Sequence, residues 1–435
     1  MQRIPQLVLP LLVTILLLAA CSTNAGSQSQ TTNGTPSLHT TNATESGVCP
    51  VGLKNNPACL TPHTLRLAYG VQQLIDQGFT GKGQTVIDIV SFGSPTLKQD
   101  MEQFDQQFGL PPADLEVISP LNVPEYDPKH DKEGWAAETA LDVEIIHAIA
   151  PDAKIIVLTS PVAETQGTIG LPEFRQLNQY VMDHKLGSIV SLSWGASELT
   201  LQDAKGQQEL QRWDTMLQQA TTQQGITYFA SSGDLGATDQ ADIDGTHIAN
   251  APTISFVNDS PWITSVGGTS VKHSDTTFSE QAWNGSGGGF SRFYKTPSYQ
   301  QSLPATVQQQ LKNRRGVPDV SADANPITGL AFSLRGMWAT AGGTSASAPL
   351  WAGIMAIANQ MAGHPLGFIN PGLYKLAANP SNYAQDFHDI TIGNNTNSAA
   401  KVEGYPAVPG WDPVTGLGTP NAVKLIPDLM QTMKS

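Results

Sequence analysis

The chain has 435 residues, of which 40% are hydrophobic and only 14% are charged, and its formal net charge is −14. This apolar content suits a globular core, and the acidic balance argues against nucleic-acid binding through a basic surface. Because a surface with few charged residues forms few salt bridges, protonation of its carboxylates at low pH breaks few of them.

Residues 1–20 predict a lipoprotein signal peptide. Arg3 precedes an apolar core that runs from Leu7 to Ala20, which is the pattern of a segment that directs export. The segment ends in LAAC (18–21), which resembles a bacterial lipobox, where the cysteine is lipidated. An ordinary signal peptide or a short membrane anchor is the alternative. We therefore expect an extracytoplasmic protein, lipid-anchored through Cys21 at the bacterial cell surface or secreted, with no other contact with the membrane.

Residues 21–60 are expected to form a flexible polar tether that includes a loop between two cysteines. Residues 22–48 are mainly Ser, Thr, Asn, Gly and Gln. In an exported chain, with Cys21 assigned to lipid, Cys49 and Cys59 are the only possible intramolecular disulfide pair. A metal site is less favoured because no second pair and no nearby histidine cluster completes it.

Residues 61–435 have a uniform composition without a second linker or an internal repeat, which predicts one large domain. Apolar runs at 84–90, 153–160, 187–195 and 225–234 alternate with amphipathic segments, among them 94–109 and 207–225. This alternation is typical of an α/β fold, with a parallel sheet covered by helices on both faces. Ligands bind such sheets beyond the carboxyl ends of the strands, where two polar motifs fall, SWG (193–195) and SGD (232–234).

The segment from Gly134 to about Pro151 predicts a helix with two acids on its bulkiest apolar face. Glu138 and Asp142 lie within about 40° of each other on a helical wheel, inside a stripe of large apolar side chains, whereas Glu144 lies on the far side, with His147, among alanines. Amphipathic helices normally do the reverse. Burying two acids one turn apart is costly unless they share a proton, so the pattern indicates chemistry. The alternative is an acid pair capped by a nearby Arg or Lys.

The stretch GGTSASAPLWAGIMA (342–356) places Ser345 in a glycine-preceded turn that leads into a buried helix. Pro349 suits the first turn of that helix. The free N–H groups and the positive dipole end there suit a developing oxyanion. On this stretch alone, a Ser/Thr N-cap on a core helix is an equal alternative.

A nucleophilic serine needs a base. The subtilisin pattern also has a G-T-S-x-x-x-P turn, but its histidine belongs early in the chain, whereas His247 follows a late loop. The aspartate of the first strand is displaced as well, because Asp88 lies in the middle of VIDIVSFG. A subtilisin-type Ser-His-Asp protease is therefore kept only as an alternative.

The chain contains a series of motifs in a fixed order: the E-x-x-x-D pair, SLSWG, SSGDLG, PWITSVGGTS, GGGFS, GGTSASAP and FHDITIGNN…GWDPVTGLGTP. Their order and spacing resemble the sedolisin family, the serine-carboxyl peptidases. The resemblance covers roughly residues 60–425, and it implies a subtilisin-like, seven-stranded parallel α/β fold in a single large catalytic domain.

The resemblance also implies residue roles. Ser345 would be the nucleophile, Glu138 its base and acid, and Asp142 the partner that orients Glu138. Asp234 would lie in the oxyanion hole. A carboxylate accepts the serine proton only when it is ionised while its neighbourhood holds another proton, and an aspartic acid donates to an oxyanion only when it is protonated. Both conditions predict activity at acidic pH.

Substrate binding follows from the same resemblance. Ser193, Trp194 and Gly195 would pair with the backbone of an extended peptide, strand to strand. The expected partners are therefore peptide or protein substrates and no nucleic acid, and the expected state is a monomer.

The resemblance implies one calcium ion at the C-terminal motif. Its ligands would be Asp389, Ile390, Val408, Gly410 and Asp412. Valine stands where the family has a glycine, and a carbonyl ligand tolerates this change only if the backbone does not need a positive φ. An ordinary Gly-Pro turn is the alternative.

One departure concerns the region before the domain. Family members commonly carry a long folded prosegment, but only about forty residues separate Cys21 from LTPHTLRLAYG (60–70).

Taken together, the motifs and the N-terminal segment predict a secreted, lipid-anchored serine-carboxyl endopeptidase. A catalytically inactive binding lipoprotein on the same fold is the alternative from another class.

Overall fold

The structure is a computed structural model that describes residues 47–53, 56, 58–127, 132–164, 166–274 and 277–434. The predicted signal peptide, the lipidation site Cys21 and the tether up to residue 46 lie outside the described residues. Within the described part, no helix is both long and apolar enough to cross a membrane.

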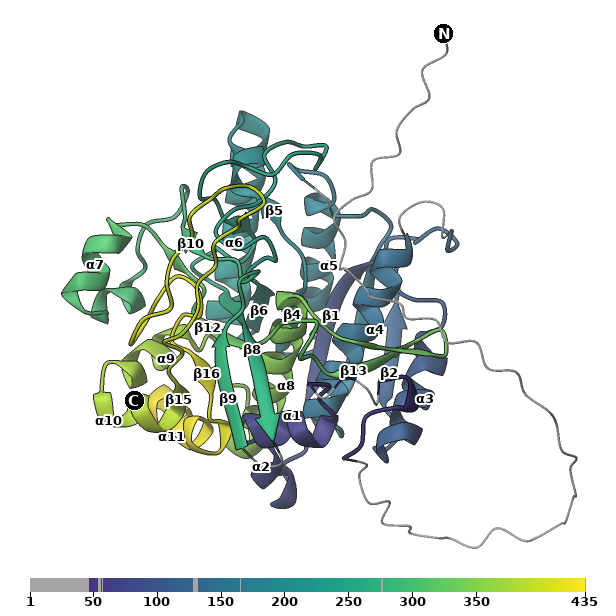
Figure 1. Cartoon of the computed structure of the whole chain (residues 1–435). Helices are drawn as coiled ribbons and strands as arrows, with labels where there is room; N and C mark the ends of the chain where they lie inside the picture. The colour runs from purple at the N-terminus through teal and green to yellow at the C-terminus, as the bar shows by residue number, and fades with distance from the viewer. Residues whose placement is uncertain are drawn as a thin grey trace, which may run out of the picture.

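An eight-stranded sheet runs through the middle of the molecule (Figure 1). Seven strands are parallel, in the order β12-β8-β6-β4-β1-β3-β2, and β9 pairs antiparallel with β8. The strands are β1 (Thr85–Ser91), β2 (Asp114–Ile118), β3 (Lys154–Ser160), β4 (Ile189–Leu192), β6 (Thr227–Ser231), β8 (Thr264–Ser274), β9 (Thr277–Ala282) and β12 (Val320–Asp323). The predicted parallel α/β sheet is confirmed.

Helices cover both faces of this sheet, as predicted. Side chains alternate along β1, so that Ile87 and Ile89 join the core under α5 and α6, whereas Val86 and Val90 join the core under α4 and α8. The helices are α1 (Pro62–Ala68), α2 (Gln72–Asp76), α3 (Leu97–Phe108), α4 (Lys132–Ile149), α5 (Leu171–His184), α6 (Ala204–Gln223), α7 (Ala305–Leu311), α8 (Thr344–Ala362), α9 (Asn370–Ala377), α10 (Pro380–Asp386) and α11 (Ala422–Lys434).

Short pairings outside the main sheet hold the loops around it. They are β5 (Ala196–Ser197) with β7 (Ser255–Phe256), β10 (Gly289–Phe290) with β11 (Gly316–Val317), β13 (Ala331–Leu334) with β14 (Met337–Thr340), and β15 (Phe387–His388) with β16 (Thr419–Pro420).

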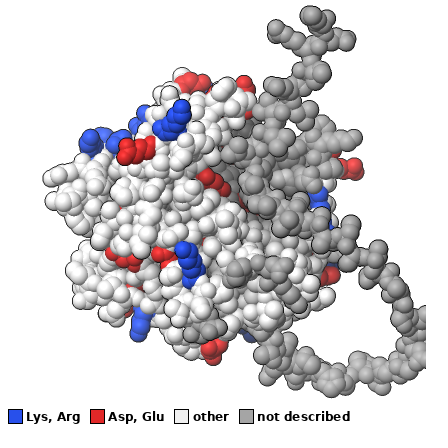
Figure 2. Space-filling model, in the orientation of Figure 1, with Lys and Arg blue, Asp and Glu red and all other residues white. Residues whose placement is uncertain are grey.

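On the surface shown in Figure 2, charged side chains are scattered between wide uncharged areas, as the low charge content predicts.

The N-terminal cysteine loop is attached to the domain. Cys49 and Cys59 form a disulfide, as expected. The backbone of Leu60 then bonds to Gly329 and Ala331, at 3.0 and 2.9 Å, and its side chain is fully buried. The packed domain therefore begins at least at Cys59, slightly before the predicted boundary at residue 61.

Helix α4 confirms the predicted helix but is buried on every side. Glu144 and His147, expected on the far side from the acid pair, have no exposed surface. The Ser333 N–H of β13 donates to Glu144 at 2.8 Å, and His147 pairs with Asp105 of α3 at 3.0 Å. The helical wheel separated the two faces correctly but could not show that α3 and β13 cover the second one.

Helix α8 begins at Thr344, earlier than the start predicted from Pro349. Proline is tolerated inside this helix because the missing N–H leaves only one carbonyl without its partner. That carbonyl belongs to Ser345, and it accepts the hydroxyl of Ser193 at 3.4 Å instead.

Helices α4 and α8 cross at Gly353. A Cβ atom there would lie 2.7 Å from Cβ of Ile149 and 2.8 Å from its Cγ2, which is closer than real Cβ atoms come. Because α4 carries Glu138 and α8 carries Ser345, this crossing sets how closely the predicted base and nucleophile approach.

We expect Gly353→Ala to destabilise the protein by about 1–3 kcal/mol, because the added methyl group overpacks the crossing. Helix propensity alone favours alanine by about 1 kcal/mol, so a net loss reports the clash. Chemical denaturation measures the change. Gly52→Ala is the control, because nothing lies within 4 Å of its Cβ position, and equal stability of both variants would contradict the role of the crossing.

Candidate active site

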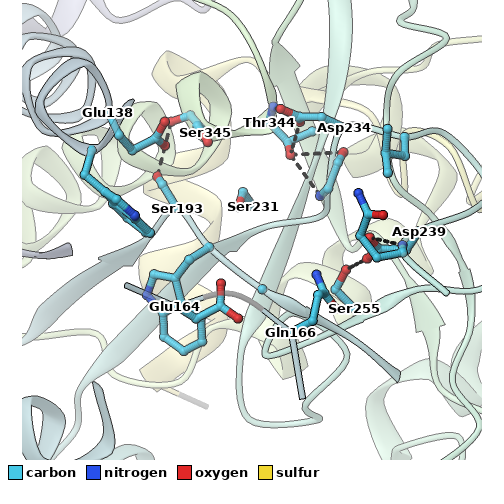
Figure 3. A pocket seen from close by; sticks show the side chains of 16 residues that line it. Glu138, Glu164, Gln166, Ser193, Ser231, Asp234, Asp239, Ser255, Thr344 and Ser345 are labelled. Atoms are coloured by element: carbon cyan, nitrogen blue, oxygen red, sulfur yellow. Dashed lines mark hydrogen bonds between the residues drawn. The ribbon is translucent and has the colours of Figure 1, made fainter. Parts of the chain in front are cut away.

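The predicted catalytic residues meet in a cavity of about 260 Å³. It opens where β4 and β6 end, with Ser193 and Ser231 in its wall, as expected for the carboxyl ends of parallel strands. Ser345, Glu138 and Asp234 line it, and Figure 3 shows Glu138 beside Ser345 on one side and Asp234 beside Thr344 on the other.

Glu138 faces the serine from the first half of α4. Burial raises the pKa of Glu138 to about 8, hydrogen bonding with Ser345 lowers it in part, and the charges of Asp234 and Asp88 raise it further. The buried acid and the serine hydroxyl are therefore in direct contact, as a general base and a nucleophile must be.

Asp142 lies one turn further along α4 and is fully buried. Burial raises its pKa well above the ordinary range, and the neighbouring carboxylates of Asp88 and Glu138 raise it further. The Ser193 hydroxyl donates to Asp142 Oδ1 at 3.0 Å. Asp142 thus forms the second layer of the site, behind Glu138.

A third carboxyl group, Asp88 of β1, completes this cluster. Burial raises the pKa of Asp88 to about 7, and the neighbouring carboxyl group of Asp142, with which it can share a proton, lowers it in part. The sequence interpretation set Asp88 aside because it lies in mid-strand. The signal was its position, since Asp88 lies two residues from both Val86 and Val90 along β1 and therefore points to the same face as they do, under α4.

The cluster contains no basic group among the described residues, and every charge that shifts the three pKa values comes from another acid. The alternative to the catalytic interpretation was an acid pair capped by Arg or Lys. The described part of the chain contains no such cap. Like charges so close cannot all ionise, so the three carboxyl groups titrate as a unit and retain protons.

Asp234 is held against the start of α8. Its Oδ1 accepts the Thr344 N–H at 2.7 Å and the Thr344 hydroxyl at 2.9 Å. Gly343, with φ of 83°, makes this approach possible, because a Cβ there would lie 2.5 Å from Asp234 Oδ2. Desolvation by the surrounding protein raises the pKa of Asp234, and the hydrogen bonds from Thr344 lower it in part.

The segment Ser193–Gly195 lines the same cavity, but two of its side chains turn away from it. The Ser193 hydroxyl serves Asp142, and Trp194 is 5% exposed and packs on Phe174 and Trp213. Gly195 approaches the Phe256 carbonyl so closely that a Cβ would lie 3.0 Å from it. Pairing with a substrate backbone stays a prediction.

His247 is not placed to act as a base. Its side chain is 78% exposed, it bonds to Asp242 at 2.5 Å, and it does not line the cavity. Among the described residues around Ser345, the group placed to act as its base is therefore a carboxyl group and not a histidine.

The predicted calcium ligands converge on one loop. Asp389 accepts the Gly410 N–H at 3.1 Å, while Asp412 accepts the N–H groups of Val408, Val414 and Thr415 at 2.9–3.0 Å. Val408 does not have a positive φ, so valine is compatible with a carbonyl ligand there.

The donor set fits a hard cation. No described residue donates a hydrogen bond to the carbonyl oxygens of Ile390, Val408 or Gly410. The described residues contain no cluster of three or more His, Cys, Asp or Glu side chains that could hold a metal, so an ion here would need these carbonyls beside the two carboxylates.

Comparison with known proteins agrees with this geometry. The model of the Subtilase family matches residues 133–367. Kumamolisin from Bacillus sp. (strain MN-32) is 33% identical over 383 residues, which make up 86% of this chain and 64% of kumamolisin. Tripeptidyl-peptidase 1 from Rattus norvegicus is 29% identical over 405 residues, 88% of this chain and 66% of the relative. The chain thus spans just under two thirds of the length of these relatives.

Among solved structures, Pseudomonas sedolisin, a serine-carboxyl proteinase complexed with two molecules of pseudo-iodotyrostatin, has a TM-score of 0.70 and 27% identity. The match covers 84% of this chain and 96% of that one. The family model, the relatives and the solved structure thus agree with the family that the order of the motifs indicates, and the chain belongs to the sedolisin family of subtilisin-like proteins.

Proposed function

We propose that the chain is a serine-carboxyl endopeptidase that hydrolyses peptide bonds of peptide or protein substrates at acidic pH. The observation that carries the proposal is the contact between Ser345 and a buried cluster of three carboxyl groups in which the described residues supply no cation. A purely structural cluster of this kind would be costly, and perturbed acids in a cleft mark functional sites.

The geometry supports a two-step acyl transfer. Ser345 Oγ attacks the scissile carbonyl carbon while Glu138 accepts its proton, and Glu138 then returns that proton to the leaving amine. Water repeats the sequence on the acyl-enzyme and releases the acid product. When the cluster loses one proton, Asp142 and Asp88 retain theirs behind Glu138, so the one negative charge can reside on the carboxyl group that faces the serine, and that form accepts the proton of Ser345.

The oxyanion would form beside Asp234 and the first turn of α8. A neutral Asp234 donates a hydrogen bond to the oxyanion, whereas an ionised one repels it. Because both the cluster and Asp234 act while holding protons, the proposal includes an acidic working range.

The proposal also covers location. The apolar run up to Ala20 and the lipobox-like LAAC (18–21) support export and lipid attachment at Cys21. The polar composition of residues 22–48 supports a tether between that anchor and a monomeric domain.

We further propose one structural calcium ion bound by Asp389, Asp412 and the carbonyls of Ile390, Val408 and Gly410. When bound, calcium would neutralise the two carboxylates and tie together segments that are far apart in sequence.

Glu138→Gln should lower kcat by about 10²–10⁴-fold, because an amide cannot accept the serine proton. His247→Ala should stay within about two-fold of wild type, because the ring does not reach the cavity. Hydrolysis of an internally quenched peptide at acidic pH measures both. An inactive histidine variant with an active Glu138→Gln would point to a subtilisin-type mechanism.

The protein should be more stable near pH 4.5 than near pH 7.5. Burial raises the pKa of Asp88 to about 7 and of Glu138 to about 8. Between their ordinary values and these, the unfolded chain releases protons that the native state keeps, so stability falls as pH rises. Thermal melts in chelator measure this difference.

In those melts, Asp88→Asn should lose less stability between the two pH values than wild type does, because its amide does not titrate. A melting temperature that rises toward neutral pH would contradict the assignment of buried, protonated acids.

Chelation at neutral pH should lower the melting temperature, because a ligand present at 100 times its Kd contributes about 2.7 kcal/mol. Asp389→Asn should remove this sensitivity, while Asp242→Asn, a carboxyl group in a different loop, should keep it. Melts indifferent to chelator, together with a metal-free elemental analysis, would refute the calcium site.

A further inference from the structure

The active-site cavity has a second acidic wall away from the catalytic cluster. Glu164 and Asp239 line it, with Gln166 and Ser255 between them (Figure 3). No Lys, Arg or His occurs among the described residues that line the cavity. The carboxyl groups of this wall therefore present a negative charge, or a proton when they are protonated, to any ligand that enters the cavity.

Glu164 is built into this wall with one oxygen unused. Its side chain is 8% exposed, and the Gly195 N–H donates to its carboxylate. Oε1 is buried and has no hydrogen-bond partner among the described residues. Gly170 allows the Glu164 backbone to pack closely against it, since a Cβ at residue 170 would lie 2.7 Å from the Glu164 Cα atom. A buried acceptor without a donor is costly, and a ligand that donates to it removes that cost.

Asp239 reinforces the same charge. It accepts the Ser255 hydroxyl and, at 2.7 Å, the Gln240 N–H. Both carboxyl groups line the same cavity. The charge of Asp239 raises the pKa of Glu164, and that of Asp234 in turn raises the pKa of Asp239. All three facing groups are acids, so only a cation from outside complements them.

We propose that Glu164 and Asp239 form a subsite that binds a cationic nitrogen of the peptide substrate. Its source is an Arg or Lys side chain near the scissile bond or the free amino terminus of the peptide. A cavity of about 260 Å³ has room for a long side chain beside Ser345, and Trp135, which also lines it, suits the apolar stem of Arg or Lys. The inference rests on the proposed peptidase function and adds its substrate class.

The subsite should strengthen as pH rises within the working range. Loss of a proton from Glu164 or Asp239 creates the charge that attracts the cation, while Asp234, the third facing acid, opposes that loss. Preference for a basic substrate should therefore increase from pH 3.5 to pH 5.5, even where total activity falls.

The test compares quenched peptides that carry Arg or its neutral isostere citrulline at each of three positions before the scissile bond. A second series compares free and acetylated amino termini. We expect wild type to prefer the cationic member of one matched pair by about ten-fold or more in kcat/KM, since a hydrogen bond to a charged group contributes about 1.5–3 kcal/mol.

Glu164→Gln and Asp239→Asn should each reduce that ratio. Asp242→Asn, an exposed acid outside the cavity, should keep it. Ratios near one in wild type, or ratios unchanged in both cavity variants, would overturn the subsite. A preference that occurs in the Arg and citrulline series and disappears in the variants identifies the nitrogen as that of a side chain. The same result in the series of free and acetylated termini identifies it as that of the amino terminus.

Binding of the same peptides to Ser345→Ala by calorimetry separates this proposal from the peptidase function. Tighter binding of the Arg peptide or of the free-amine peptide than of its neutral partner, lost in Glu164→Gln, supports the subsite even if no peptide is cleaved. Equal binding of the members of every pair overturns it, and a wild-type protein that cleaves no peptide contradicts the peptidase function alone.

Discussion

Three carboxyl groups buried without a basic partner among the described residues are the constraint on which the rest of the structure depends. Asp88, Glu138 and Asp142 come from a central strand and from the helix above it, and they are compatible with the core only while they share protons. That condition links folding to chemistry. The protons that make burial tolerable belong to the same groups that the proposed mechanism uses, so under that proposal stability and activity both depend on pH.

The start of α8 is shaped by this cluster and by Asp234 on its other side. Gly343 admits the Asp234 carboxyl group, which docks onto Thr344. Pro349 leaves the Ser345 carbonyl without its helical partner, and the single hydroxyl hydrogen of Ser193 is shared between Asp142 at 3.0 Å and that carbonyl at 3.4 Å. The hydroxyl of Ser193 therefore joins the nucleophile turn to the carboxyl cluster. Gly353 lets α4 and α8 approach, so the distance between acid and serine follows from backbone packing rather than from flexible side chains.

The cleft contains acids with separate tasks. In the proposed mechanism the cluster beneath Ser345 exchanges protons and Asp234 lies beside the oxyanion, while Glu164 and Asp239 line the cavity that a substrate would enter. None of these groups has a basic partner in the described wall of the cavity. An acidic environment suits all of them, because protonation removes the repulsion between them. The C-terminal loop around Asp389 and Asp412 and the disulfide between Cys49 and Cys59 do not line this cavity.

The amino-acid sequence by itself determined the parallel α/β class, the placement of Glu138 and Asp142 on one face of a helix, and the family, because strand and helix periodicities and the order of motifs are local properties of the chain. Only the tertiary structure decided that Asp88 joins the pair, that α3 and β13 bury the far face of α4, that α8 begins before Pro349, and that Glu164 and Asp239 line the same wall of the cavity. Periodicity specifies which side of an element a residue faces, whereas contacts between distant segments decide what lies opposite that side.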